Sequence, residues 1–236
     1  MRAITLVLPF YENPGMLREQ QRVWREYPDD IKRRLHVVVV DDCSPTAPAL
    51  PAVEETGVAS FRLYRTKVDV RWNWLFCRNL GVAVADTQWV LLTDIDHVVP
   101  AATLCALMTE RLDPRSVHRF ARVDAPAMTP YKPHPNSWFL TRSMFDDIGG
   151  YDERFSGFYG TDAEFRDRVH ATARVVVMRE DVLVRYPREV LADASTTTYG
   201  RKEEQDKTNV PRIREQRNKD PKWRPLRVTF PYERLL

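Results

Sequence analysis

Two aspartates separated by one residue stand where this chain could hold a metal ion. Asp94 and Asp96 follow an apolar run that has the length of a strand, and His97 comes directly after them. A pair of carboxylates at a strand end suits Mg²⁺ or Mn²⁺, because hard divalent cations prefer oxygen ligands and often bridge to substrate phosphates. The same pair could instead form a turn that caps a helix expected around Leu104.

A third aspartate, Asp162, lies in the segment TDAEF at the expected start of a helix. On that helix Asp162, Phe165 and Val169 share one face, so an apolar anchor would hold the carboxylate in place. The free N–H groups of the first turn favour the ionised carboxylate, which is the form that a general base needs. The alternative is an ordinary N-cap aspartate. Glu164 points to the other side of this helix.

An alternation of strands and helices would position these carboxylates. The expected strands of the first part span residues 3–9, 35–41, 61–66 and 88–93, with helices over residues 14–27 and 73–85. The run 35–41 is apolar on both faces, which is typical of a parallel sheet covered by helices on each side. Ligands of such open sheets bind at the carboxyl ends of the strands, where Asp41, Asp42 and Asp94 stand.

The second part begins with a proline-rich connection. Four prolines fall within residues 125–135, which predicts an extended, irregular segment. The elements expected beyond it are strands at 137–141, 174–178 and 182–186 and a turn at Gly149 and Gly150. We therefore expect a single domain over residues 1–200, with halves 1–124 and 125–200, followed by a partly helical basic tail, 201–236.

The tail carries eleven Lys or Arg residues against six Asp or Glu, whereas the whole chain has a net charge of +3. Such a tail could attract nucleic acid or a membrane surface. The mixed signs of RKEEQDK, however, are more typical of a solvated helix face.

The composition is that of an ordinary folded domain. With 43% hydrophobic and 29% charged residues, the chain is neither disordered nor fibrous. No run approaches the roughly 18 apolar residues that a membrane helix needs. Cys43, Cys77 and Cys105 are odd in number and form no CxxC pair, which disfavours a disulfide framework and a structural zinc site. We therefore expect a cytoplasmic protein.

Four blocks of the sequence resemble glycosyltransferase family 2, a group of GT-A-fold enzymes that use nucleotide-sugar donors. LVLPFYEN is similar to the family's first strand and nucleotide-facing turn, and VVVVDDCS to its DDxS signature. CRNLGVAVADTQWVLLTDIDH resembles the RNxG helix and the DxD motif, and GGYDERFSGFYGTDAEF resembles the GGFDE segment that leads to the ED-type motif. Together the blocks span about residues 3–170 in family order, which is far more specific than one motif.

The sequence departs from the family pattern at two points. Thr161 stands where the family usually has Glu, and no histidine follows Tyr186, where relatives often supply a further metal ligand. A third protein ligand to the metal is therefore not identified from the sequence.

The resemblance implies roles for individual residues. Those expected to bind the nucleotide sugar are Pro9, Phe10, Tyr11, Asp41 or Asp42, Arg78, Asn79 and Asp94. Arg78 could instead form a salt bridge to a nearby aspartate, and Asn79 could cap a backbone turn. The metal ligands implied are Asp94, Asp96 and His97 for Mn²⁺ or Mg²⁺. Asp162 would be the general base, and Trp138, Tyr159 and Glu164 are expected on the acceptor side.

The implied fold is α/β of the GT-A type, a mostly parallel central sheet flanked by helices with a smaller acceptor-side half. The implied reaction is an inverting single displacement, in which Asp162 takes a proton from an acceptor hydroxyl and a nucleoside diphosphate leaves a donor expected to be a UDP-sugar. A saccharide or glycan is the expected acceptor. Because the tail is basic, a hydroxymethylated base in viral DNA is the alternative acceptor.

Two other classes of function are alternatives to this one. A nucleotide-sugar-binding module or inactive relative would keep the pocket without turnover, and the change to Thr161 motivates it. A nucleotidyltransferase would need a Gly-rich phosphate loop with a basic residue, which PFYENPG does not supply.

Overall fold

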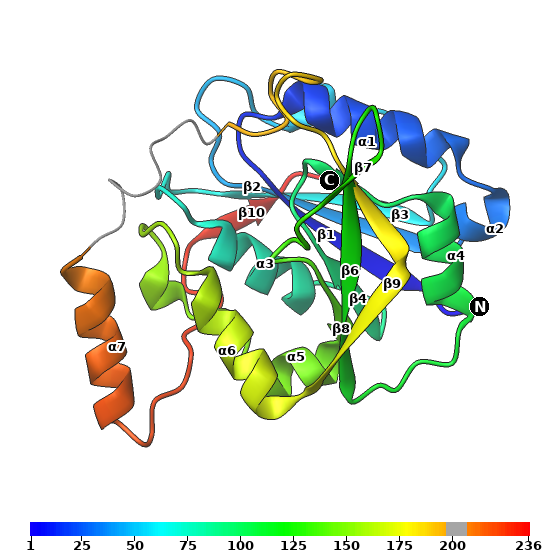
Figure 1. Ribbon diagram of the computed structural model, residues 1–236. Helices are drawn as coiled ribbons and strands as arrows, with labels where there is room; N and C mark the ends of the chain where they lie inside the picture. The colour runs from blue at the N-terminus through cyan, green and yellow to red at the C-terminus, as the bar shows by residue number, and fades with distance from the viewer. Residues whose placement is uncertain (197–206) are drawn as a thin grey trace.

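The computed structural model describes residues 1–196 and 207–236 and has one ten-stranded sheet at its centre (Figure 1). The strands follow the order β10-β3-β2-β1-β4-β8-β6-β9-β5, and β7 pairs with β6. Their bounds are β1 (Ile4–Phe10), β2 (Leu35–Asp41), β3 (Ser60–Thr66), β4 (Trp89–Leu92), β5 (His97–Val98), β6 (Ser116–Asp124), β7 (Thr129–Tyr131), β8 (Trp138–Thr141), β9 (Arg174–Arg185) and β10 (Tyr232–Arg234). The run β3-β2-β1-β4 is parallel, whereas β8 is antiparallel to both β4 and β6.

Helices cover both faces of the sheet (Figure 1). Their bounds are α1 (Pro14–Glu26), α2 (Asp29–Lys32), α3 (Trp74–Ala83), α4 (Ala101–Thr109), α5 (Arg142–Ile148), α6 (Asp162–Thr172) and α7 (Asn209–Lys219), with 3-10 turns η1 (Leu50–Ala52) and η2 (Glu153–Phe155). On β2, Val37 and Val39 join the core under α1 and α4, whereas Val38 and Val40 pack against α3. Burial on both faces explains the unbroken apolar run of this strand.

Helix α3 lies unusually close to the sheet. A Cβ atom placed on Gly81 would come within 2.2 Å of Cγ1 of Val7 on β1. Only glycine therefore fits at this point, where the helix backbone crosses the strand. The glycine of the RNxG block is thus a packing residue, and it sets the distance of α3 from β1.

The second half of the chain continues the same sheet. The proline-rich segment 125–135 contains β7, a short strand that pairs with the end of β6. Strand β9 is a single element, where the sequence suggested two strands. Met178 pairs with Phe120 of β6 and Val182 pairs with Ala121, so residues 179–181 are inserted between two neighbouring pairs. This bulge explains why the apolar pattern reads as two short strands.

The expected tail, 201–236, begins with residues 201–206, which lie outside the described residues together with most of RKEEQDK. Its described part contains α7, which packs on η2 through Val210, Ile213 and Phe155. The chain then returns and adds β10 to the edge of the sheet, antiparallel to β3 (Figure 1). The tail thus contributes an edge strand that the sequence did not predict. In residues 1–196 and 207–236, no helix combines the length and the apolar character needed to cross a bilayer.

Candidate active site

A cleft of about 390 Å³ opens where β1, β2 and β4 end, and residues of both halves line it. The predicted site residues that line it are Pro9, Phe10, Tyr11, Asp42, Asp94, Asp96, His97, Tyr159 and Asp162. This is the edge at which open parallel sheets bind their ligands, because the loops after neighbouring strands converge there. The predicted residues that do not line it are Asp41, Arg78, Asn79, Trp138 and Glu164.

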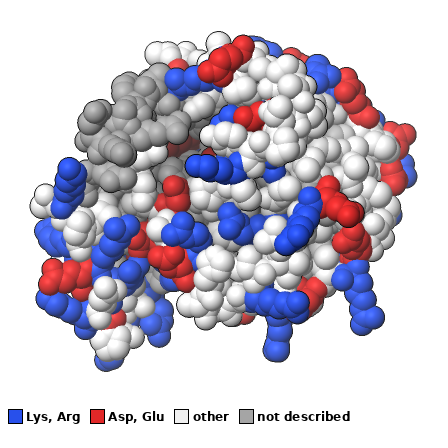
Figure 2. All heavy atoms as spheres, in the orientation of Figure 1, with Lys and Arg blue, Asp and Glu red and all other residues white. Residues whose placement is uncertain are grey.

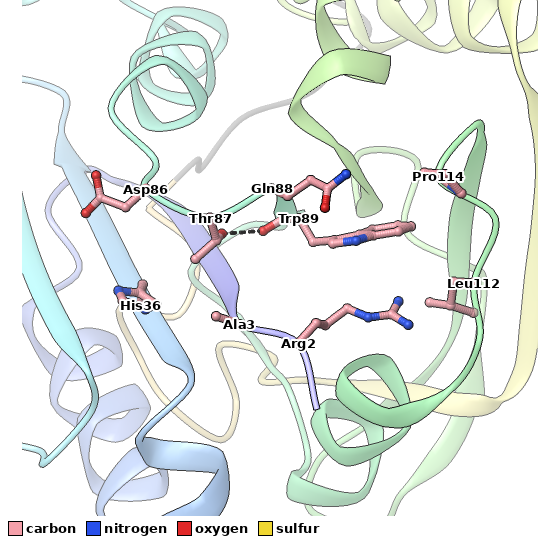
Figure 3. Close-up of a pocket in the computed structure, with 9 residues that line it drawn as sticks. All are labelled: Arg2, Ala3, His36, Asp86, Thr87, Gln88, Trp89, Leu112 and Pro114. Atoms are coloured by element: carbon pink, nitrogen blue, oxygen red, sulfur yellow. Dashed lines mark hydrogen bonds between the residues drawn. The ribbon is translucent and has the colours of Figure 1, made fainter.

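A second hollow lies at the opposite ends of the same strands (Figure 3). Arg2 extends there beside Trp89, with its guanidinium carbon 4.9 Å from the ring centre. Its one carboxylate, Asp86, is paired with Arg62 at 2.9 Å. None of its lining residues was predicted to act in chemistry, so the cleft that four aspartates line is the candidate site.

Asp94 is held from behind by Arg78. The Arg78 guanidinium pairs with Oδ1 of Asp94 and also donates to the Tyr151 hydroxyl and the Asn136 carbonyl, while Nε2 of His134 lies 3.1 Å from Oδ2. Burial opposes ionisation of Asp94, but Arg78 and His134 outweigh it and hold the pKa of this carboxyl well below its usual range. Arg78 is thus the partner of an aspartate that itself faces the cleft.

Asp96 and His97 form a fixed pair. Nδ1 of His97 lies 2.6 Å from Oδ1 of Asp96, and Nη1 of Arg122 lies 3.1 Å from Nε2 of the same ring. Because arginine can only donate, Nε2 must accept and Nδ1 must carry the proton that it donates to Asp96. Both ring nitrogens of His97 therefore already form hydrogen bonds, so neither is free to bind a metal ion.

Asp162 is the first residue of α6, and Thr161 holds the N-cap position. Nδ2 of Asn136 donates to Oδ1 of Asp162 across the cleft. Phe165 and Val169, one and two turns further along, are buried in the core under this helix. The carboxylate thus has a buried apolar anchor on its own helix and an amide partner from the opposite wall.

The neighbouring aspartates after β2 have different surroundings. Asp41 is buried, and its two oxygens accept hydrogen bonds from the backbone N–H groups of Ser44 (2.8 Å) and Ala49 (2.9 Å). Asp42 lines the cleft, and its Oδ1 has no partner. Burial, assisted by the charge of Asp69, raises the pKa of Asp42 to about 7. Of the two residues that the sequence left open, Asp42 is the one that lines the cleft.

Asn79 and Trp138 lie away from the cleft. Nδ2 of Asn79 donates to the carbonyl of Tyr151 (2.8 Å) and to Glu153 (2.7 Å), and its Oδ1 accepts from the Tyr151 N–H. This side chain thus ties α3 to the loop before η2, as the turn-capping alternative implies. Trp138 is fully buried, with its ring edge-on to that of Phe165.

Glu164 serves the tail and not the cleft. It is 4% exposed and accepts hydrogen bonds from Arg214 and Arg217 of α7. Figure 2 shows basic and acidic side chains interspersed over the part of the surface that α7 occupies. One carboxylate thus pairs with two arginines of the tail and offsets one of their two positive charges.

Several residues of the cleft were not singled out from the sequence. Trp72 and Trp74 precede and begin α3, and the Trp72 ring lies 5.0 Å from that of Tyr159. Trp72 has a φ of +58°, a left-handed conformation that non-glycine residues adopt at a cost and that is concentrated at functional sites. His134 and Asn136 come from the proline-rich segment and its end. The two tryptophans of RWNW are the one sequence signal that could have indicated these cleft residues.

The carboxylates fit a divalent cation that substrate helps to hold. Among the described residues, no three His, Cys, Asp or Glu side chains are arranged as a metal cage. Both oxygens of Asp94 are engaged, and Oδ1 of Asp96 accepts from His97, which leaves the second oxygen of Asp96 as the candidate ligand. Mg²⁺ and Mn²⁺ sites commonly use one or two carboxylates, with phosphate oxygens and water as the other ligands.

Comparisons with known proteins bear on the fold. No protein-family model and no curated protein sequence matches the chain. The structure is similar to S. aureus TarS 1-349 in complex with UDP-GlcNAc, with a TM-score of 0.63 and 16% identity over 83% of this chain and 62% of that one. It is also similar to the mannosyltransferase PcManGT from Pyrobaculum calidifontis in complex with GDP-Man and Mn²⁺, with a TM-score of 0.57 and 19% identity over 78% and 57% of the two chains.

These similarities confirm the expected α/β fold of the GT-A type, with a large central sheet flanked by helices. The aligned part spans about 62% of the length of the TarS structure. Because a fold can carry unrelated activities, function has to be argued from the residues of the cleft.

Proposed function

We propose that this protein is a metal-dependent glycosyltransferase that moves a sugar from a nucleotide-sugar donor to an acceptor hydroxyl. The observation that carries the proposal is that Asp42, Asp96 and Asp162 line one cleft. These carboxylates suit three separate tasks, which are contact with a base, charge neutralisation through a cation, and proton removal. The nucleotide-sugar complexes of the two similar structures support this use of the cleft.

In this proposal the donor nucleoside lies between β1 and α3. Asp42 faces the base, and a carboxyl group opposite the N–H of a uracil imide is chemically apt, so a UDP-sugar is the expected donor. Pro9, Phe10 and Tyr11 line the cleft together with the aromatic ring of Trp72. A ring face of this kind stacks on a base or a sugar.

Asp162 is the proposed general base. It takes the proton from the acceptor hydroxyl as that oxygen attacks the anomeric carbon, and the C–O bond to the nucleoside diphosphate breaks with inversion. Asn136 keeps the carboxylate turned toward the cleft through its hydrogen bond. A divalent cation held by Asp96 and the diphosphate would offset the charge on the leaving group.

A saccharide or glycan is the proposed acceptor. Tyr159 and Trp72 offer aromatic faces at the cleft, and such faces suit sugar rings. Binding of DNA through the tail is less favoured, because Arg214 and Arg217 are already paired with Glu164.

Release of nucleoside diphosphate from UDP-, GDP- and TDP-sugars, with and without Mn²⁺, tests this function. Asp162→Asn should lower the rate about 10² to 10⁴ fold, the typical contribution of a general base. Asp167→Asn is the matched control, because Asp167 lies on the same helix with a side chain that is 69% exposed. Release that is equal in the wild type and in Asp162→Asn would refute the assignment of the base. Nucleotide binding without release from any donor would favour the binding module.

A further inference from the structure

Two arginines of the second half, Arg122 on β6 and Arg185 at the end of β9, line the cleft and have no task in the reaction above. Strand pairing brings them together, because β6 runs beside β9 and Arg185 pairs with Asp124, two residues after Arg122. Their guanidinium carbons lie 4.5 and 4.2 Å from the centre of the Tyr131 ring. We call Arg122 and Arg185 the arginine pair.

The two members of the arginine pair differ in how their charge is met. Nε and Nη2 of Arg185 donate to the two oxygens of Asp124 at 2.8 and 2.6 Å, which is a bidentate pair. Arg122 is only 8% exposed, and its Nη1 donates to the neutral His97 ring. Its Nε is buried and has no partner. Within residues 1–196 and 207–236, no carboxylate oxygen lies within ion-pair distance of Arg122.

A buried cation without an anionic partner is costly, and an anionic ligand would offset that cost by supplying the missing charge. Both side chains line the cleft, and Nε of Arg122 is buried without a hydrogen-bond partner. A guanidinium presents several N–H groups in one plane, which matches the oxygens of a phosphate or carboxylate. The arrangement thus has the charge and the donors of an anion site.

We propose that Arg122 and Arg185 bind an anionic group of a substrate, a phosphate or a carboxylate, in the half of the cleft that β6, β7 and β9 form. The proposal rests on the proposed function only in assigning substrates to this cleft. Two sources share this chemistry, namely the diphosphate of the donor and an acidic group carried by the acceptor. Tyr131, which is 46% exposed, would flank the bound group at the rim of the cleft.

Binding of inorganic pyrophosphate to the full chain tests the site without turnover. In calorimetric titrations we expect Arg122→Gln and Arg185→Gln to weaken pyrophosphate binding at least 10-fold. Arg122→Lys, which keeps the charge, should lose less. The control is Arg174→Gln, because Arg174 begins the strand that Arg185 ends. Equal affinity in all four variants and the wild type, or no binding by any of them, would overturn the proposal.

The free protein offers a second readout. Because Arg122 is buried without a carboxylate partner, Arg122→Gln without ligand should unfold at the same temperature as the wild type or a higher one. A large decrease in its melting temperature, together with unchanged pyrophosphate affinity in the same Arg122→Gln variant, would indicate a purely structural residue and would contradict the anion site.

The source of the anion is decided by two further titrations. If Arg122→Gln weakens binding of UDP but not of uridine, the bound group is the donor's diphosphate. The alternative result is that UDP binds equally to the wild type and to Arg122→Gln, while methyl glucoside 6-phosphate or methyl glucuronide competes with pyrophosphate for the wild-type protein. In that case the group belongs to the acceptor. Pyrophosphate binding by a wild-type protein that releases no nucleoside diphosphate from any donor would retain the site and reject the proposed transferase.

Discussion

The adjacent carboxylates of Asp41 and Asp42 differ because backbone N–H groups donate to both oxygens of Asp41, whereas Oδ1 of Asp42 has no partner. Asp41 is the last residue of β2, and both of its oxygens accept N–H groups of the loop that follows. Asp42 is buried beside Asp69 without such donors for its Oδ1, so its neutral form is favoured. The pair shows how a DDxS sequence separates a loop-stabilising residue from a ligand-facing one.

A pH dependence of stability follows from Asp42. Its pKa is about 7 in the fold and near 3.9 in an unfolded chain, so the folded state holds one proton more between these values. Stability contributed by this group is present below about pH 4 and decreases as the pH rises to 7. Asp42→Asn removes this pH-dependent loss of stability. We expect the variant to have a free energy of unfolding about 2–4 kcal/mol higher than that of the wild type at pH 8, and an equal one at pH 4.

Urea unfolding of both proteins at several pH values measures this effect. The matched control is Asp41→Asn, which places an amide N–H against a backbone N–H of the loop and should be destabilised at every pH. Parallel stability curves for the wild type and Asp42→Asn would contradict the elevated pKa.

At the scale of elements, the contact between α3 and β1 depends on Gly81. Its position in the RNxG block allows Arg78 and Asn79 to reach Asp94 and Tyr151 from one helix that lies close to the sheet. A larger residue would push the whole helix outward, and both interactions would lengthen.

We expect Gly81→Ala to lower the free energy of unfolding by about 1–3 kcal/mol, the usual cost of overpacking a core. The added methyl would overlap with Val7, so Val7→Ala should create room for it. In a double-mutant cycle measured by denaturant unfolding, the double variant should therefore be more stable than the sum of the single changes predicts. Strict additivity would show that Val7 does not oppose the alanine.

Helix α6 performs two tasks with opposite faces, because Asp162 faces the cleft while Glu164 receives α7. The two residues are two positions apart, which on a helix directs their side chains to different sides. The acidic motif therefore couples the candidate base and the attachment of the tail to one rigid element.

At the scale of the whole molecule, the tail is fastened at several places, among them Glu164 under α7, Glu153 beside Val228 and Thr229, and β10 at the sheet edge. Glu164→Gln leaves Arg214 and Arg217 without their anion. Because those side chains are 39% and 29% exposed, we expect a loss of only about 1–3 kcal/mol, with faster hydrogen exchange concentrated in α7.

Glu215→Gln is the control for this loss, since Glu215 and its partner Lys219 are both well exposed and their pair should contribute little. Hydrogen exchange followed by mass spectrometry distinguishes the two variants. Unchanged exchange of α7 in Glu164→Gln would mean that the apolar contact of Val210 and Ile213 with Phe155 is sufficient to hold the helix.

Much of the first half could be predicted from the sequence. The strand expected at 35–41 matches β2, and the helix expected at 14–27 matches α1 to within one residue. These elements are specified locally, by apolar runs and by Pro14 at the first helical position. Strand β6 and helix α5 were not predicted. Charged residues interrupt the apolar pattern of SVHRFARVD, and α5 is only seven residues long.

The sequence by itself determined the α/β architecture and brought Asp42, Asp94, Asp96 and Asp162 into consideration, because strand ends and helix starts are local features. Only the tertiary structure decided which side chains share the cleft. The pairing of β9 with both β5 and β6 joins segments that are far apart along the chain, and neither partner carries a signal for the other. Arg122, His134, Asn136 and Arg185 entered the site through that pairing and the packing around it, which no local pattern encodes.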